Sequence, residues 1–249
     1  MERDEQITFY TSAYSPYCHR VAIALAEAGL EVTKCEINLQ PGSKQPWFTK
    51  VNPLGTVPAF TIGGAPAAPE DPSPDARRLW ESSVLLELIA ELRPRAGLLP
   101  GDAGARGAVR LFVARAHDTL HGAFRQFFFA PTGRAHAFAA GLEAFQALLA
   151  PRGYALGAWS LADVAVAPFV VRTAVLAEHE EIGKYPRGEG AKLLAALAEP
   201  RFARFRAYCA LLLARPSVRD TFDRELNVKM WRIHPNVGRN TPHPSHASH

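Results

Sequence analysis

Residues 11–29 read TSAYSPYCHRVAIALAEAG, and this stretch decides the fold of the first part of the chain. It follows a short apolar run at residues 7–10 that predicts a buried strand. Apolar residues recur at helical spacing after Pro16 and predict a helix that ends at Gly29. Proline is favoured in a first helical turn because its missing N–H costs nothing there. We therefore expect Ser15 directly before the helix, where unpartnered N–H groups and the positive end of the helix dipole favour an anion.

The sequence up to residue 95 predicts the order strand–helix–strand–helix–strand–strand–helix. The pair Val57–Pro58 is a candidate for a cis peptide bond, which leaves Val57 able to offer backbone hydrogen bonds to a ligand. Residues 65–75 are rich in proline and alanine and predict an exposed loop. After the first helix, strands are expected at residues 31–37, from residue 57 onward and at residues 79–80. The last helix of this part is expected at residues 81–93.

The second part of the chain is helical in pattern throughout. Residues 95–104 contain glycine and proline with little periodicity and predict a linker. The sequence thus predicts an α/β domain at residues 1–95 and an all-α helical bundle at residues 105–249, with a poorly packed tail from residue 236 onward. Helices are expected at residues 107–129, 135–149, 160–177, 191–198, 201–215 and 218–228.

Composition narrows the class of protein. The chain has 249 residues, 48% of them hydrophobic, a net charge of +4 and three cysteines. The cysteines are too few and scattered for a disulfide framework, the N-terminus lacks a signal peptide, and no apolar run approaches the ~20 residues of a membrane helix. The basic residues form no stripe, and the histidines near the C-terminus have spacings that suit no defined metal site. We expect a cytoplasmic protein that binds no membrane, nucleic acid or metal.

Four local motifs carry a resemblance to a known family. Residues 15–18 (SPYC) resemble the C-P-Y-C active site of thioredoxins and glutaredoxins with serine in place of the first cysteine. A thioredoxin-like domain followed by a helical bundle resembles the cytosolic glutathione transferases. The spacing and Lys44, three residues before Trp47, most resemble the fungal, serine-containing members of the omega class. The other motifs are residues 52–58 (NPLGTVP), like the family's cis-proline loop, 81–82 (ES), like its glutathione-carboxylate site, and 159–163 (WSLAD), like a helix start in its second domain.

The resemblance implies a glutathione transferase fold, a role in detoxification, a homodimer, and glutathione as co-substrate. It implies Ser15 as the catalytic residue, whose hydroxyl hydrogen-bonds the glutathione sulfur. Lys44 would meet the glycine carboxylate, and the backbone of Val57 would pair with the cysteinyl part. The implied glutathione-binding residues are Pro16, Tyr17, Lys44, Val57, Pro58, Glu81 and Ser82, and Tyr17, Phe127 and Phe128 are candidates for a hydrophobic substrate pocket.

The serine at position 15 decides the expected reaction type. A cysteine there would take glutathione as a mixed disulfide, whereas serine leaves the free thiolate to attack a hydrophobic electrophile or reduce a peroxide. Two alternatives stay open. One is a non-catalytic, ligandin-type binder of aromatic or polyphenolic compounds, and the other is a glutathione-dependent thiol reductase that uses Cys18.

Each candidate residue also has a purely structural interpretation. Ser15 can be an N-cap, Cys18 a small packed hydrophobe, and Lys44 a solvated charge. His19, four residues after Ser15, is expected to face solvent. Three further structural interpretations concern a helix start at Glu81–Ser82, a stabilising capping box at Ser160 and Asp163, and a core position for Phe124 and residues 127–129.

Overall fold

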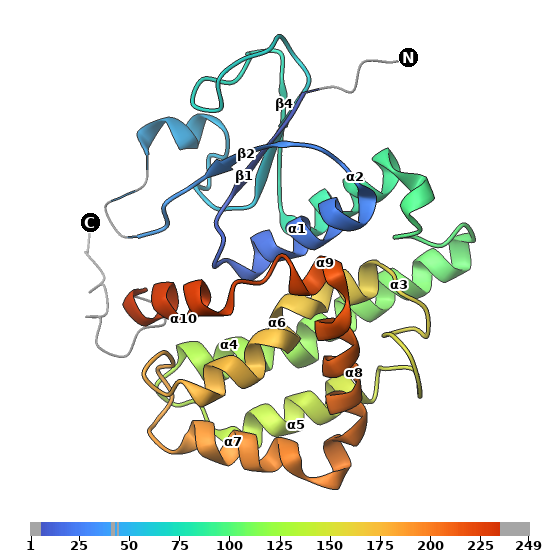
Figure 1. The fold of residues 1–249 in the computed structure, drawn as a ribbon, viewed down its shortest axis with the longest axis vertical. Helices are drawn as coiled ribbons and strands as arrows, with labels where there is room; N and C mark the ends of the chain where they lie inside the picture. The colour runs from blue at the N-terminus through green and yellow to red at the C-terminus, as the bar shows by residue number, and fades with distance from the viewer. Residues whose placement is uncertain (1–5, 41–42, 44, 235–249) are drawn as a thin grey trace. The chain divides into compact units, whose positions relative to one another are not determined.

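The computed structural model describes residues 6–40, 43 and 45–234. The chain divides into two compact units, Met1–Leu98 and Leu99–His249. The first is an α/β unit and the second is all-helical (Figure 1), as the sequence predicts.

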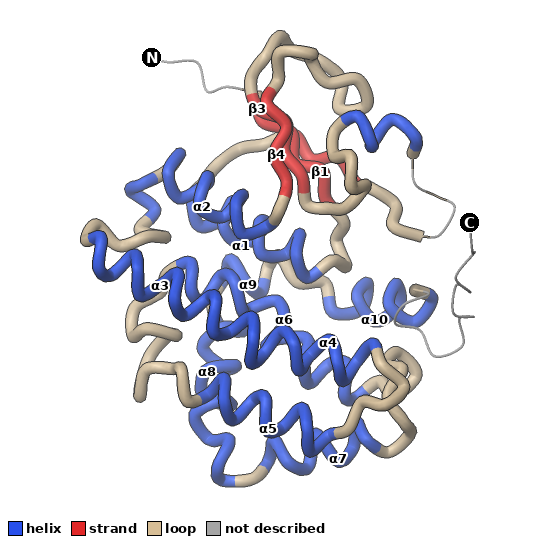
Figure 2. Tube along the Cα trace, turned by 180° about the vertical axis from the view of Figure 1, so that it is seen from behind, coloured by secondary structure: helices blue, strands red, loops and turns tan. Residues whose placement is uncertain are grey.

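The first unit is built on a four-stranded mixed sheet in the order β2-β1-β3-β4. Its strands are drawn in red in Figure 2. Strand β1 pairs in parallel with β2 and antiparallel with β3, and β3 pairs antiparallel with β4. Helices α1 and α2 pack against each other on one side of the sheet (Figures 1 and 2). The bounds are β1 Ile7–Thr11, α1 Pro16–Ala28, β2 Thr33–Glu36, β3 Ala59–Ile62, β4 Arg77–Trp80 and α2 Ser82–Leu92.

Alternation along the strands gives the sheet two different faces. Phe9 and Phe60 lie opposite each other on β1 and β3, and their rings meet edge to face at 5.5 Å. Tyr10 faces the other way and packs against Phe48 of the short 3-10 helix η1 (Pro46–Lys50). The sequence predicts a helix after the second strand, and the structure has this 3-10 helix there. The segment that begins at Pro46 is five residues long, too short to form a stable α-helix.

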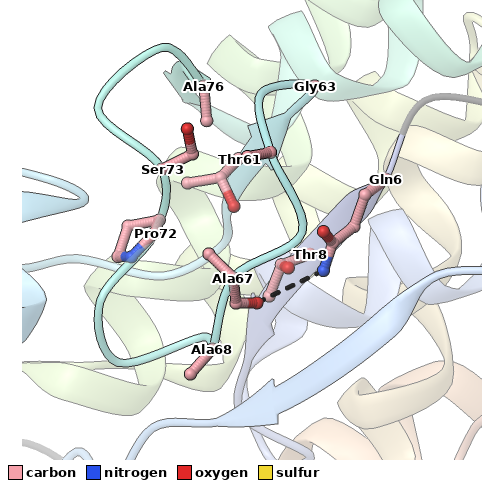
Figure 3. A pocket seen from close by; sticks show the side chains of 10 residues that line it. Gln6, Thr8, Thr61, Gly63, Ala67, Ala68, Pro72, Ser73 and Ala76 are labelled. Carbon is pink, nitrogen blue, oxygen red and sulfur yellow. Dashed lines mark hydrogen bonds between the residues drawn. The ribbon is translucent and has the colours of Figure 1, made fainter.

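The proline-rich segment 65–75 is a mostly exposed loop, as predicted, and it folds back over the sheet. The hydroxyl of Tyr10 donates to the Pro69 carbonyl at 2.8 Å. Gln6 Nε2 donates to the Ala67 carbonyl at 3.4 Å (Figure 3). Between the segment and the strands lies a cavity of about 10 Å³, lined by Thr8, Thr61 and Ser73 among others. That volume has room for about one water molecule, so this cavity is excluded as a site for a peptide or an aromatic compound.

The second unit packs its helices around α6, which is buried along almost its whole length. Figure 2 shows these helices in blue, with no strand among them in the described part of this unit. The α-helices are α3 Ala103–Ala116, α4 Gly122–Phe129, α5 Ala135–Gln146, α6 Leu161–Glu178, α7 Glu189–Ala198, α8 Ala203–Ala214, α9 Pro216–Arg219 and α10 Arg224–Ile233; η2 Pro94–Ala96 precedes them and η4 Pro200–Phe202 leads into α8.

Two helix predictions are wrong in detail. The helix expected at residues 107–129 is divided by a π turn, His117–His121, between α3 and α4. The helix expected at 218–228 is two helices, because the chain leaves the helical conformation after α9 and Asp223 starts α10 afresh. The Asp223 carboxylate accepts the Leu226 N–H at 2.8 Å, a strong N-cap that favours a new helix start. The predicted tail from residue 236 lies outside the described residues.

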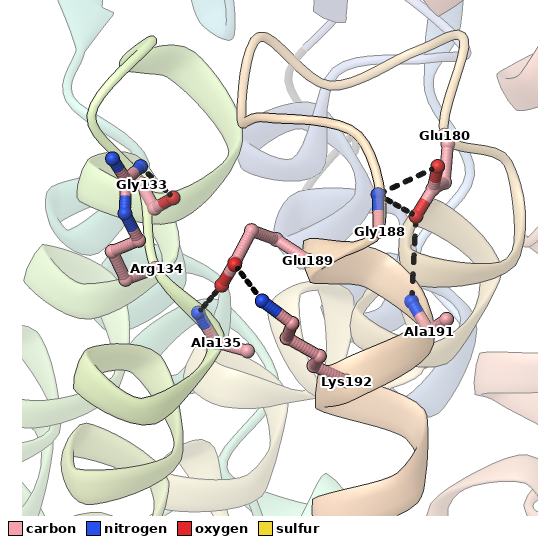
Figure 4. A network of polar contacts seen from close by, with 8 residues as sticks. All are labelled: Gly133, Arg134, Ala135, Glu180, Gly188, Glu189, Ala191 and Lys192. Carbon is pink, nitrogen blue, oxygen red and sulfur yellow. Dashed lines mark hydrogen bonds and ion pairs between the residues drawn. The ribbon is translucent and has the colours of Figure 1, made fainter.

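Carboxylates cap two helices of this unit from a distance in sequence (Figure 4). Glu189, the first residue of α7, accepts the N–H of Ala135 at 2.7 Å and so caps α5. Glu180 accepts the N–H of Gly188 at 2.9 Å and thereby caps α7. The negative charges sit at the positive ends of the helix dipoles, where they stabilise the helix starts.

Candidate functional site

The sheet topology brings three predicted site segments to one end of the first unit. The end of β1 lies beside the start of β3, since Tyr10 pairs with Ala59. The end of β4 lies beside that same start, because Ala59 also pairs with Trp80. Ser15 follows β1, residues 57–58 precede β3, and residues 81–82 follow β4, so their segments all extend from this end. Pairing register, which the sequence does not state, brings the three separate motifs to the same end of the sheet.

Ser15 caps α1 as the sequence predicts. Its hydroxyl oxygen accepts the N–H of Cys18 at 3.3 Å, and its side chain is 7% exposed. The turn before it is fixed at several points: Ser15 N–H donates to the Ser12 carbonyl at 3.0 Å, and Ala13 N–H donates to the Glu36 carboxylate at 2.9 Å. The cap uses a lone pair of the Ser15 oxygen, and a serine hydroxyl also has one hydrogen to donate.

Cys18 is part of the core of this helix. It is 1% exposed, and its sulfur accepts the N–H of Ser12 at 3.3 Å. Burial raises the pKa of the Cys18 thiol to about 11, although the hydrogen bond with Ser15 opposes the rise. The packing interpretation of Cys18 is therefore confirmed, and very little of it is thiolate at neutral pH.

His19 corrects an expectation. The sequence analysis placed it in solvent, but it is 2% exposed. It shares a buried face of α1 with Pro16 and Ile23, three residues before it and four after it. Helix α1 is thus buried on more than the stripe that its sequence pattern marks, and it packs against α2 and the 3-10 helix η2.

The peptide bond between Val57 and Pro58 is cis, as predicted. Asn52 holds the preceding turn: its side-chain Nδ2 donates to the Thr56 carbonyl at 2.7 Å, and its Oδ1 accepts the N–H of Leu54 at 3.0 Å. Val57 is half-buried and leads directly into β3. The loop is therefore held by its own side-chain hydrogen bonds.

Glu81 and Ser82 begin α2 in an unusual way. Glu81 has φ +71°, in the left-handed region that residues other than glycine rarely occupy. Such a conformation costs about 1–3 kcal/mol and concentrates at functional sites. The Glu81 side chain is exposed, whereas Ser82 is buried and accepts a hydrogen bond from Arg20 Nη1 of α1 at 3.3 Å. Neither the backbone of Glu81 nor the contact of Arg20 has a signal in the sequence.

The remaining predicted residues are Lys44, Tyr17 on α1, and Phe127 and Phe128 in the helical unit. Lys44 lies outside the described residues. Tyr17 is half-buried on α1, with the Arg20 guanidinium 5.6 Å from its ring centre. Phe127 and Phe128 of α4 are 1% and 0% exposed, and Phe127 stacks on Tyr185 at 4.5 Å. Their rings belong to the aromatic core of the helical unit, which replaces the suggestion that they line an open pocket.

The helical unit does contain an apolar cavity of about 280 Å³ between α6, α7 and α8. Its walls include Val170, Leu194, Leu197, Phe205 and Cys209. Burial raises the pKa of the Cys209 thiol to about 12, so this thiol is inert at neutral pH. Among the described residues, no group of three or more metal-ligating side chains is close enough to hold an ion.

Comparison with known proteins identifies the family. The N-terminal domain model of glutathione S-transferases matches residues 14–92. Glutathione transferase Omega 2S from Trametes versicolor is 41% identical, with 94% of this chain and 99% of that one covered and a TM-score of 0.85. The chain belongs to the glutathione transferase family. Omega 1C from the same organism is 39% identical, with 92% and 95% covered and a TM-score of 0.86.

The similarity is to the omega class along nearly the whole chain. A third structure, Omega 2S of Trametes versicolor in complex with 2,4-dihydroxybenzophenone, is 42% identical over 91% of this chain and 97% of that one, with a TM-score of 0.84. Glutathione S-transferase Z1 of Arabidopsis thaliana is 32% identical over 100 residues, which span 40% of each protein. The glutathione transferase fold expected from the sequence is confirmed, and no described helix is long and apolar enough to cross a membrane.

Proposed function

We propose that this glutathione transferase holds the glutathione thiolate at Ser15 and transfers it to hydrophobic electrophiles, with peroxide reduction as a related activity. The observation that carries the proposal is the buried Ser15 hydroxyl at the start of α1, at the sheet end shared with the cis-proline loop and the start of α2. A free thiol has a pKa of about 8.5, and a hydroxyl donor beside helix N–H groups lowers that value and raises the thiolate fraction.

The chemistry of glutathione suits the other residues at this end of the sheet. Glutathione has two carboxylates and one ammonium group. In the proposal, the Ser82 hydroxyl and the first N–H groups of α2 bind the γ-glutamyl carboxylate, and the exposed Glu81 carboxylate binds the ammonium. The backbone of Val57 pairs with the cysteinyl part, Pro58 shapes that loop, Pro16 and Tyr17 flank the sulfur, and Lys44 meets the glycine carboxylate.

The domain assignment belongs to the same proposal: residues 1–95 bind glutathione and residues 105–249 supply the hydrophobic pocket. Phe127 and Phe128 are no longer assigned to that pocket, because they are core residues. A cytoplasmic homodimer, expected from the resemblance, completes the proposal.

A non-catalytic carrier of aromatic compounds is the second candidate. Trametes versicolor Omega 2S, 42% identical to this chain, has been solved in complex with 2,4-dihydroxybenzophenone. The apolar cavity of about 280 Å³ in the helical unit is near the usual size range of small-molecule sites, about 300–1,000 Å³. The thiol-reductase alternative is disfavoured, because burial and a pKa of about 11 keep the Cys18 thiol protonated.

Turnover with glutathione tests the proposal. The wild type is assayed with an aromatic electrophile and with a glutathionyl mixed disulfide, beside Ser15→Ala, Ser15→Cys and Ser15→Asp. We expect conjugation by the wild type, its loss in Ser15→Ala, and a change to thiol transfer in Ser15→Cys. Ser15→Asp is the matched control for stability, since aspartate caps helices as well as serine does but its charge repels a thiolate.

Three outcomes separate the candidates. Conjugation that survives both Ser15→Ala and Ser15→Asp contradicts the assignment of the thiolate to Ser15. A wild type that binds glutathione and aromatics but turns over neither substrate supports the carrier. Reductase activity that is lost in Cys18→Ser and kept in Ser15→Ala supports the reductase.

A further inference from the structure

Arg20 connects the two helices that frame the proposed glutathione site. It lies on α1 and is partly buried, and its Nη1 donates to the Ser82 hydroxyl oxygen, 3.3 Å away at the start of α2. Burial lowers the pKa of the Arg20 guanidinium to about 10, which still leaves it protonated at neutral pH. A full positive charge therefore stands beside Ser82.

The direction of this hydrogen bond matters for what Ser82 can do. A serine hydroxyl has one hydrogen to donate and two lone pairs that accept. Because Arg20 has no acceptor, it must donate and Ser82 must accept, which leaves the Ser82 hydrogen available for an anion. The first N–H groups of α2 also have no partner within the helix. Ser82 is thus set as a donor next to other donors.

We propose that Arg20 is a positioning residue for the γ-glutamyl carboxylate of glutathione, acting through the hydroxyl of Ser82. This inference rests on the proposed function. By fixing Ser82 as a donor and placing a positive charge behind it, Arg20 makes the site selective for a ligand with a carboxylate at this position. If Arg20 only joined α1 to α2, its replacement would change the affinity of the site for all ligands equally.

The test compares two ligands by isothermal titration calorimetry. One is glutathione, and the other is 4-aminobutanoyl-cysteinylglycine, which lacks only the α-carboxylate of the γ-glutamyl group. The measured quantity is the dissociation constant of the analogue divided by that of glutathione. A weakening of the site that affects both ligands equally leaves this ratio unchanged. We expect Arg20→Gln to reduce the wild-type ratio by about tenfold, the size of one hydrogen bond to a charged group. Ser82→Ala should reduce it similarly, and adding Arg20→Gln to Ser82→Ala should change it little.

Arg95→Gln is the matched control for loss of one positive charge. Arg95 is exposed in η2, beyond the far end of α2, which is about 17 Å long at about 1.5 Å per residue. Its ratio should equal that of the wild type. Arg20→Met, which has neither the charge nor a donor, provides a second variant if Arg20→Gln does not fold: its ratio should fall in the native background and stay constant in the Ser82→Ala background.

The results separate this inference from the proposed function. If the wild type binds glutathione and Arg20→Gln weakens both ligands equally, Arg20 is structural and the inference is overturned. If Arg20→Gln does not fold, an unchanged ratio in Arg20→Met overturns the inference. If the wild type binds neither ligand, the proposed glutathione site fails first, and the role of Arg20 fails with it.

Discussion

Replacing Asp163 by alanine removes an acceptor that organises the start of α6. The Asp163 carboxylate accepts hydrogen bonds from Ala155 N–H at 2.7 Å, Ser160 N–H at 3.0 Å and Tyr208 O–H at 2.9 Å. Asp163 is 0% exposed and the three donors are also buried. Together with the Ser160 hydroxyl, it forms the capping box that the sequence predicts.

The expected loss in the free energy of unfolding follows from the number of donors that lose their acceptor. Alanine at position 163 leaves three buried donors without an acceptor, and each costs about 1–3 kcal/mol. Even at the lower limit, the free energy of unfolding falls by about 3 kcal/mol. Asp102→Ala is the matched control: Asp102 caps α3 by accepting a single N–H from Ala105, and its side chain is exposed. That loss should be about 1 kcal/mol.

The effect of Asp163 also depends on pH. Burial raises the pKa of its carboxyl from 3.8 to about 6, against the opposing hydrogen bonds. A pKa that is higher in the folded state contributes stability at low pH, and this contribution is lost as the pH rises through about 6. The advantage of the wild type over Asp163→Ala should therefore be larger at pH 5 than at pH 8, by about 1–2 kcal/mol.

Urea unfolding followed by circular dichroism at pH 5 and pH 8 measures both effects. A loss below about 1 kcal/mol at pH 8 would show that the three donors find other partners and would refute the count of stranded groups. An advantage that shrinks on acidification would refute the raised pKa.

The other predictions concern helix packing and a second carboxylate. Gly107→Ala, on an exposed face of α3 with no atom within 4 Å of the new Cβ, should raise the free energy of unfolding by about 0.5–1 kcal/mol. Gly190→Ala should lower it by at least about 1 kcal/mol, because its Cβ would stand 2.4 Å from the Ala177 carbonyl; equal effects of the two substitutions in urea would contradict this packing. The hydrogen bond from Ala135 lowers the pKa of Glu189 below 4.5, so the advantage of the wild type over Glu189→Ala, about 1 kcal/mol at pH 7, should decrease as the pH falls from 4.5 through the lowered pKa. An advantage that stays constant from pH 7 down to pH 3 would argue against it.

Local signals in the sequence were sufficient for several features of the site. A serine followed by proline predicted the cap of α1, and the structure has that cap. The Val57–Pro58 bond is cis as expected, and Ser160 with Asp163 forms the predicted capping box. These features depend on residues within a few positions of one another, which is why a single stretch of sequence predicts them.

Other features depend on contacts between residues far apart in the chain. His19 is buried on a face of α1 that the apolar pattern of this helix does not mark. Phe127 and Phe128 are core residues because their rings pack against Phe138 and Tyr185. The backbone of Glu81 and the hydrogen bond of Arg20 to Ser82 likewise arise where separate elements meet.

The sequence by itself determined the two kinds of domain, the caps and the identity of the groups available for chemistry, because propensity and capping act over a few residues. Only the tertiary structure decided that Ser15, the cis-proline loop and the start of α2 share one end of a sheet. Strand register and helix packing set that arrangement, and they are properties of long-range burial and pairing that no local pattern contains.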